Sequence, residues 1–258
     1  MSFNFLKKWL FPKKINWTIV PEFQQTTLGK RLKNFDDAFN MEGEYIDVKV
    51  FKISLEGKNY YLKKYVMFKR VIPRYISFSK VKKEWENLLL FHDLGIPAAK
   101  LVAYGQETRG KVVHRGVLIT EELVDCQDLS SVADNFKSLL KESGWVTKVS
   151  HQVAEVARTL HEHNFAHNDF KWRNIMVDIK ADFPQIYLID CPAGMKWYKP
   201  FLEYRIIKDL ACLDKRAKYE LSKSQRLAFY KDYAQCRKLT AKDKKRIRKI
   251  IQFFHNRE

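Results

Sequence analysis

The segment 167–174, together with Asp190, constrains the fold of this chain more than any other feature. The segment reads His-Asn-Asp-Phe-Lys-Trp-Arg-Asn, and Asp190 ends the apolar run 186–189 that follows. An Asp in a tight turn can accept the proton of an attacking hydroxyl, while an Asn and a strand-terminal Asp can hold Mg²⁺ between phosphates. Each residue type is common, but the ordered set predicts a phosphoryl-transfer site.

The charge balance points to an anionic partner. The 258 residues include 48 Lys and Arg against 30 Asp and Glu, which gives a formal net charge of +18. A hydrophobic content of 46% is enough for a core, so a disordered chain is not expected. A surplus of this size indicates nucleic acid, a phospholipid surface or a phosphorylated substrate, and charge alone does not choose among them.

The cysteines and the apolar runs indicate a cytoplasmic protein. Cys126, Cys191, Cys212 and Cys236 have neither C-x-x-C nor zinc-ligand spacing, which favours reduced thiols. No apolar run approaches the roughly 18 residues needed to span a bilayer. The N-terminus also lacks the apolar core and small-residue cleavage site of a signal peptide.

Residues 1–24 form a basic, amphipathic N-terminal segment. Its first part, 1–14, interleaves aromatic and leucine side chains with lysines. Such side chains can enter the headgroup boundary of a membrane, and each lysine near anionic lipid contributes about 1 kcal/mol. The segment is therefore a candidate membrane anchor, and the open alternative is a segment that packs on the domain.

The first half of the chain has the pattern of a small sheet. Two extended stretches flank Glu56 and Gly57, which predict the turn of a β-hairpin. Apolar residues then recur at helical spacing, and Gly95 and Pro97 end that helix. The expected elements are hairpin strands over 45–53 and 60–65, one helix over 80–92, and strands over 101–104 and 116–120.

The second half is predicted to be mainly helical. Val149, Val153, Val156 and Leu160 lie at helical spacing, and their helix should end near Asn164, just before the segment 167–174. The elements expected after it are short strands over 175–177 and 186–189 and helices over 199–258.

The strand 60–65 carries a candidate phosphate-binding lysine. Lys63 occupies the place of the lysine in V-A-I-K, and Glu84 on the following helix would orient it. Two alternatives remain open. Lys64 lies on the opposite strand face, and Glu86 competes with Glu84 as the partner.

Each remaining residue of the motif has an expected role. Asp169 would be the catalytic base, while Asn174 and Asp190 would be the metal ligands. Lys171 could stabilise charge on the transferring phosphate, as cations do at developing oxyanions. His167 would brace the loop as a structural residue.

These motifs resemble the protein-kinase-like superfamily and, within it, the bacterial lipopolysaccharide core kinases. That group includes heptose and 3-deoxy-manno-octulosonic acid (Kdo) kinases and InaA-like proteins. The resemblance covers roughly residues 44–215. The segments that carry it are 61–63, 83–87, 94–97, 118–123, 167–174, 189–192 and 208–211.

The resemblance implies an α+β, two-lobed protein-kinase-like fold. Residues 25–123 would form an N-lobe and hinge, with a small antiparallel sheet and one helix, and 124–258 a mainly helical C-lobe. It implies ATP and Mg²⁺ as cofactors, with the backbone of Glu121 and Leu123 at the adenine. Asp209 would be the buried acid that accepts hydrogen bonds from the catalytic loop.

The implied acceptor is a sugar hydroxyl of the lipopolysaccharide core or another lipid-linked sugar. The protein would be cytoplasmic and peripheral on the anionic surface of the inner membrane, and no nucleic-acid partner is expected. A small-molecule or protein kinase and a non-catalytic pseudokinase scaffold are the alternatives. The chain lacks G-x-G-x-x-G, Asn168 replaces the Arg of H-R-D, and Cys191-Pro192 replaces Phe-Gly, so control by a phosphorylated activation loop is not expected.

Overall fold

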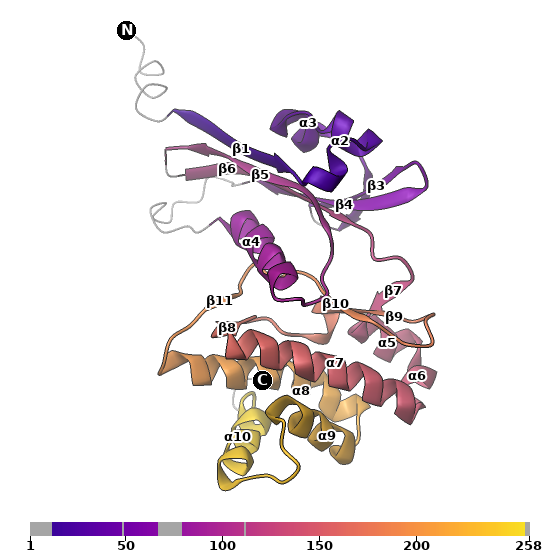
Figure 1. The fold of residues 1–258 in the computed structure, drawn as a ribbon, viewed down its shortest axis with the longest axis vertical. Coiled ribbons are helices and arrows are strands. Elements are labelled where there is room, and N and C mark those ends of the chain that lie inside the picture. The colour runs from indigo at the N-terminus through magenta and orange to yellow at the C-terminus, as the bar shows by residue number, and fades with distance from the viewer. Residues whose placement is uncertain (1–11, 48, 67–78, 111, 256–258) are drawn as a thin grey trace. The chain divides into compact units, whose positions relative to one another are not determined.

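The computed structural model describes residues 12–47, 49–66, 79–110 and 112–255. The chain divides into two compact units, and most of their helices and strands are labelled in Figure 1. Unit 1 contains Met1–Leu89 and Ala99–Glu122, and unit 2 contains Leu90–Ala98 and Leu123–Glu258. The boundaries 25–123 and 124–258 for the two lobes stay predictions.

Unit 1 is built on a six-stranded sheet in the order β1-β5-β6-β4-β3-β2, in which every neighbouring pair is antiparallel. The edge strand β1 was not predicted, and it brings Lys13 and Lys14 of the N-terminal segment into the sheet. The strands are β1 (Lys13–Ile19), β2 (Glu44–Asp47), β3 (Val50–Leu55), β4 (Lys58–Val66), β5 (Leu101–Arg109) and β6 (Val112–Glu121).

The predicted hairpin is confirmed, with one correction. Glu56 and Gly57 have φ angles of 51° and 74° and join β3 to β4, as a two-residue turn with both residues in the left-handed region should. The stretch 45–53 is not one strand, because the chain turns at Lys49, where φ is 73°. The sequence alternates without Gly or Pro through this point, so periodicity alone could not locate the turn.

The predicted helix is also confirmed, as α4 (Lys80–Asp93), but the expectation of one helix in the N-lobe is wrong. Unit 1 also contains the short helices α2 (Thr27–Arg31) and α3 (Phe35–Asn40) and a 3-10 helix at Pro21–Phe23. The side chains of Thr26 and Asn34 cap α2 and α3. Helices of 5 and 6 residues are too short to show a helical period.

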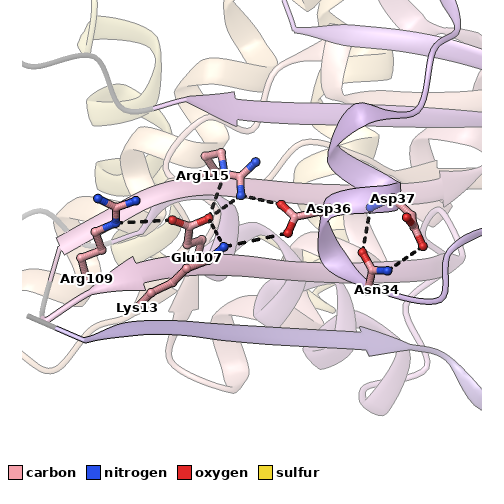
Figure 2. A network of polar contacts seen from close by, with 7 residues as sticks. All are labelled: Lys13, Asn34, Asp36, Asp37, Glu107, Arg109 and Arg115. Carbon is pink, nitrogen blue, oxygen red and sulfur yellow. Dashed lines mark hydrogen bonds and ion pairs between the residues drawn. The ribbon is translucent and has the colours of Figure 1, made fainter. Parts of the chain in front are cut away.

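A polar network joins β1, β5 and β6 to α3 (Figure 2). Glu107 is 3% exposed and forms ion pairs with Arg115, Lys13 and Arg109, and Arg115 also lies 2.6 Å from Asp36. Burial alone would raise the pKa of Glu107, but the Arg115 hydrogen bond and the surrounding cations outweigh burial and lower it. The buried carboxylate thus stays charged and ties the edge strand to the sheet.

Unit 2 is mainly helical, as predicted. The helix predicted before the segment 167–174 is α7, and its apolar residues Val149, Val153, Val156 and Leu160 are buried. The helices are α5 (Leu129–Asn135), α6 (Lys137–Lys141), α7 (Ser143–Glu162), α8 (Phe201–Glu220), α9 (Lys223–Ala234) and α10 (Ala241–Gln252). Short strands form two antiparallel ladders, β10-β9-β7 and β11-β8: β7 (Cys126–Asp128), β8 (Phe165–Ala166), β9 (Ile175–Asp178), β10 (Ile186–Leu188) and β11 (Met195–Lys196).

All four cysteines are free thiols. Burial raises the pKa of Cys126 and of Cys212 to about 11, so both stay protonated near neutral pH. Within the part of the chain that the structure describes, no helix has the length and apolar character needed to cross a membrane.

Candidate active site

Asp209 on α8 holds the start of the segment 167–174 in place. Its side chain is fully buried, and its two oxygens accept hydrogen bonds from the backbone N–H groups of His167 (2.7 Å) and Asn168 (2.8 Å). The ring of His161 lies 3.5 Å from the same carboxylate. A carboxylate that satisfies two backbone donors fixes the loop against a long, packed helix.

Asn168 takes the backbone conformation that the tight turn requires. Its φ angle is +64°, in the left-handed region that Asn tolerates better than most residues. Its side-chain amide donates to the carbonyl oxygen of Ala193 (2.8 Å), and Lys208 Nζ donates to the backbone carbonyl oxygen of Asn168 (2.9 Å). No role was predicted for Lys208, although it directly precedes Asp209 on the helix that anchors the loop.

The imidazole ring of His167 packs against two aromatic rings. It is fully buried between Phe91 and Phe170, with ring centroids 6.3 Å and 5.1 Å away and nearly parallel planes. Neither ring nitrogen has a hydrogen-bond partner among the residues that the structure describes. Burial lowers the pKa of His167, so the ring is neutral near pH 7. These properties fit a bracing role better than proton transfer.

Asp169 lies among hydrogen-bond donors from its own loop. Lys171 Nζ is 2.5 Å from Oδ1, Arg173 Nη2 is 3.4 Å from Oδ2, and the Asn174 amide donates to the Asp169 carbonyl oxygen (2.8 Å) and to Oδ2 (3.3 Å). Burial would raise the pKa of Asp169, but Lys171, Asn174 and Arg173 outweigh it and hold the pKa below its ordinary value. The carboxylate is therefore ionised at neutral pH.

The two predicted metal ligands lie at the same end of the β9–β10 ladder. The backbone N–H of Ile189 donates to the carbonyl oxygen of Asn174 (3.1 Å), and Asp190 follows with a left-handed φ of 54°. The amide nitrogen of Asn174 makes both bonds to Asp169, which leaves its amide oxygen directed elsewhere. Carboxylate and amide oxygens are the hard donors that Mg²⁺ prefers.

Few protein side chains could act as Mg²⁺ ligands near Asn174 and Asp190. The described residues contain no group of three or more His, Cys, Asp and Glu that could hold a metal ion. Mg²⁺ is usually bound by one or two carboxylates together with phosphate oxygens and waters rather than by an all-protein cage. The donor set of Asn174 and Asp190 fits that mode.

In unit 1 the structure brings Lys63 and Glu84 together. Lys63 Nζ on β4 donates to Glu84 Oε1 on α4 (2.8 Å), and Glu84 is only 2% exposed. The hydroxyl of Tyr65 donates to the other Glu84 oxygen. Burial raises the pKa of Tyr65 well above its usual value, so it remains a donor. Sequence reasoning missed Tyr65, although strand alternation places it on the same face as Lys63.

The alternatives to this pair are engaged elsewhere. Lys64 Nζ donates to the carbonyl oxygen of Met41 (2.7 Å) and lies 4.7 Å from the centroid of the Phe51 ring. Glu86 is exposed and forms an ion pair with Lys82 one turn earlier on α4 (3.5 Å). Of these candidates, Lys63 and Glu84 therefore form the pair, and its carboxylate is buried.

The predicted hinge residues fall where the two units meet in the sequence. Glu121 ends β6, and its N–H donates to the carbonyl oxygen of Lys100 (2.9 Å). Leu123 begins unit 2 and accepts from the N–H of Cys126 (3.4 Å). Between them, Glu122 accepts from the Asn59 amide (2.6 Å). The adenine contacts of Glu121 and Leu123 stay predictions.

Unit 2 also contains an apolar cavity of about 440 Å³. It lies among α7, α8, α9 and α10, and aliphatic side chains dominate its walls. Examples are Val149, Val153, Leu213, Leu227, Ile247 and Ile251, and the charged side chains of Asp214, Lys223 and Arg226 also line it. No motif in the sequence indicated this cavity, because its lining residues are spread over the helices α5 to α10.

The chain is similar to a known family and to solved structures. The model of the lipopolysaccharide kinase (Kdo/WaaP) family matches residues 36–233. The solved structure "WaaP in complex with acyl carrier protein" matches with a TM-score of 0.69 and 16% sequence identity, over 93% of this chain and 96% of that one. No curated protein sequence gives a significant match. In all, 739 solved chains match the fold, so the fold by itself does not identify a substrate.

Proposed function

Because the chain belongs to the lipopolysaccharide kinase (Kdo/WaaP) family, we propose that it transfers the γ-phosphate of ATP to a sugar hydroxyl, of heptose or Kdo, in the lipopolysaccharide core. The observation that carries this proposal is the ionised Asp169, held between Lys171 and Asn174 on a loop that Asp209 fixes. A positioned carboxylate beside a cation is what transfer to a hydroxyl requires.

The residues of the loop have different roles in the proposed reaction. Asp169 accepts the proton of the sugar hydroxyl as that oxygen attacks the γ-phosphorus, and the bond from that phosphorus to the bridging oxygen breaks to release ADP. The ammonium group of Lys171, 2.5 Å from Asp169, offsets the charge on the transferring phosphate. Asn168 and Asp209 contact no reacting group in this scheme, and they position the loop.

Lys63, oriented by Glu84, would pair with the nucleotide phosphates. Asn174 and Asp190 would hold Mg²⁺, which when bound neutralises charge on those phosphates. The backbone of Glu121 and Leu123 would meet the adenine. Family membership supports the use of ATP, and the donor chemistry of Asn174 and Asp190 supports Mg²⁺.

The acceptor of such an enzyme is linked to lipid, so we assign the protein to the cytoplasmic face of the inner membrane as a peripheral protein. The net charge of +18 supports attraction to an anionic surface. Most of the predicted anchor 1–14 lies outside the residues that the structure describes.

The test is incubation of the purified protein with γ-labelled ATP and truncated core lipopolysaccharide, followed by mass spectrometry of the product. We expect one phosphate on a core sugar. Label on protein or on an aminoglycoside, and none on core sugar, would favour the rival kinase function. Nucleotide binding with no transfer to any acceptor would favour a pseudokinase scaffold.

The pH profile of a Lys171→Met variant tests the proposed base and its neighbour. Lys171 holds the pKa of Asp169 below its ordinary value, and the base acts only when ionised. Its removal should therefore move the acidic limb of the kcat/KM profile to higher pH and lower kcat by about 10²-fold. Lys180→Met is the matched control, because Lys180 forms an equally short pair (2.5 Å) with Asp125. An acidic limb that stays in place would contradict the proposed base.

The apolar cavity supports a second proposal, an acyl carrier protein as partner. The similar structure is a complex of WaaP with such a protein, and a cavity of about 440 Å³ is within the size range of ligand sites. Its aliphatic walls suit a fatty acyl chain. Calorimetry should find that the acylated carrier binds at least about tenfold tighter than the carrier without its acyl chain. Equal affinities would rule out the cavity as the acyl site.

A further inference from the structure

A set of exposed aromatic and basic side chains follows Asp190 in the chain. Tyr198 is 78% exposed, Phe201 is 66% exposed and Met195 is 39% exposed, although all three are large and mainly apolar. Lys196 and Lys199 alternate with them and are exposed too. We call these five residues the 195–201 platform. Exposed apolar groups gathered in one short segment commonly mark an interaction surface.

The backbone under the platform is firmly held. Met195 and Lys196 form β11, which pairs with β8 (Figure 1), and the N–H of Trp197 donates to the carbonyl oxygen of Asn164 (2.7 Å). Gly194 packs so closely that an added Cβ would lie 2.5 Å from the Phe165 ring. The aromatic side chains of the platform are thus exposed on a fixed backbone.

Residues next to the platform in the chain contact the catalytic loop. Asn168 donates to the carbonyl oxygen of Ala193, two residues before the platform begins (2.8 Å). The guanidinium of Arg205 stacks over the Trp197 ring, 4.0 Å from its centroid, and also reaches Asn168 Oδ1 (3.5 Å). Whatever the platform contacts is therefore presented close to the loop that carries Asp169.

The composition of the platform favours a lipid surface over a protein partner. Lysine is depleted in protein interfaces, whereas aromatic side chains next to lysines are typical of segments at the membrane–water boundary. The neighbouring carboxylate does not oppose an anionic surface, because Glu203 forms a two-bond pair with Arg246 (2.9 and 2.8 Å). The charge near the platform is therefore positive.

We propose that the 195–201 platform docks this protein on an anionic lipid bilayer, with Tyr198 and Phe201 inserted at the headgroup boundary and Lys196 and Lys199 facing lipid phosphates. Docking in this manner brings the catalytic loop to the level of the headgroups, where a lipid-linked sugar is found. The purpose of docking rests on the proposed function, but the binding itself does not, and it can be measured without ATP.

The test is co-sedimentation of the full-length protein with vesicles of phosphatidylcholine, with and without phosphatidylglycerol. Tyr198→Ser/Phe201→Ser should lower the partition coefficient by about tenfold or more, because two inserted rings are lost. Lys196→Gln/Lys199→Gln should lower it by about fivefold for each lysine on anionic vesicles and leave binding to neutral vesicles unchanged. All four side chains are exposed, so the fold should survive, and thermal unfolding verifies this.

Lys218→Gln/Tyr219→Ser provides a matched control on the same helix. Tyr219 is 73% exposed, with Lys218 Nζ 4.8 Å from its ring centroid, and it lies about 27 Å along α8 from Phe201. This control should bind vesicles like the unaltered protein. The proposal is overturned if the platform variants keep full vesicle binding, or if the control loses as much as they do. Loss of carrier-protein binding with unchanged vesicle binding would overturn it in favour of a protein surface.

Phosphate transfer to core sugar, measured separately in detergent, distinguishes this proposal from the proposed function. Platform variants should keep that activity and lose activity on acceptor embedded in vesicles. A protein that binds vesicles through the platform but phosphorylates no core sugar would refute the proposed function alone. Normal transfer with vesicle binding that is independent of the platform would refute the docking surface alone.

Discussion

Replacement of Asp169 by Asn should lower kcat for phosphate transfer by about 10²- to 10⁴-fold, the range expected when a general base is removed. The amide has nearly the shape of the carboxylate but cannot take up a proton from a sugar hydroxyl. The KM for ATP should change little, because Asp169 has no role in our scheme in binding nucleotide. The assay is single-turnover transfer from labelled ATP to core lipopolysaccharide.

The fold should tolerate this replacement. The partners Lys171 and Arg173 are 44% and 64% exposed, and ion pairs of such exposed side chains contribute at most about 1 kcal/mol. Asp182→Asn is the control, since Asp182 is an exposed carboxylate in the same unit. Full transfer activity in a correctly folded Asp169→Asn protein would remove Asp169 from the mechanism.

The parts of the site that could be predicted are those with a fixed order along the chain. The segment 167–174 and Asp190 could be identified by spacing, because a tight loop and the end of the next strand bring those residues together with little freedom. Asp209 was expected only from family resemblance, and its hydrogen bonds to His167 and Asn168 agree with that expectation. Spacing along the chain therefore predicted the loop 167–174 and Asp190, whereas family resemblance predicted Asp209.

The parts that could not be predicted depend on contacts between distant elements. Tyr65 contacts Glu84 only because β4 and α4 pack together, and Lys208 reaches Asn168 only because α8 lies under the loop. The platform was missed for another reason. Met195 to Phe201 have no periodicity that separates exposed from buried side chains, so their exposure is visible only in the folded structure.

Replacement of Asp209 by Asn should cause the largest loss of stability among these variants, about 3 kcal/mol in the free energy of unfolding. The carboxylate is fully buried and accepts from two backbone N–H groups, those of His167 and Asn168. An Asn side chain has one acceptor oxygen, so its NH₂ group would face the second N–H donor. One buried donor would then lack a partner, and the loop that carries Asp169 would shift.

Urea unfolding measures this loss as a lower midpoint at an unchanged m-value. Asp214→Asn on the same helix is the matched control. Asp214 forms a two-bond pair with Arg226 (2.7 Å each), but its side chain is 19% exposed, and neither partner holds the backbone of the loop 167–174. We expect this control to lose less, about 1.5 kcal/mol, and to keep its transfer activity. Equal losses in the two variants would mean that the backbone hydrogen bonds of Asp209 contribute no more than a partly exposed ion pair. In that case the loop must owe its geometry to other contacts, of which the stacking of His167 between Phe91 and Phe170 is the strongest candidate.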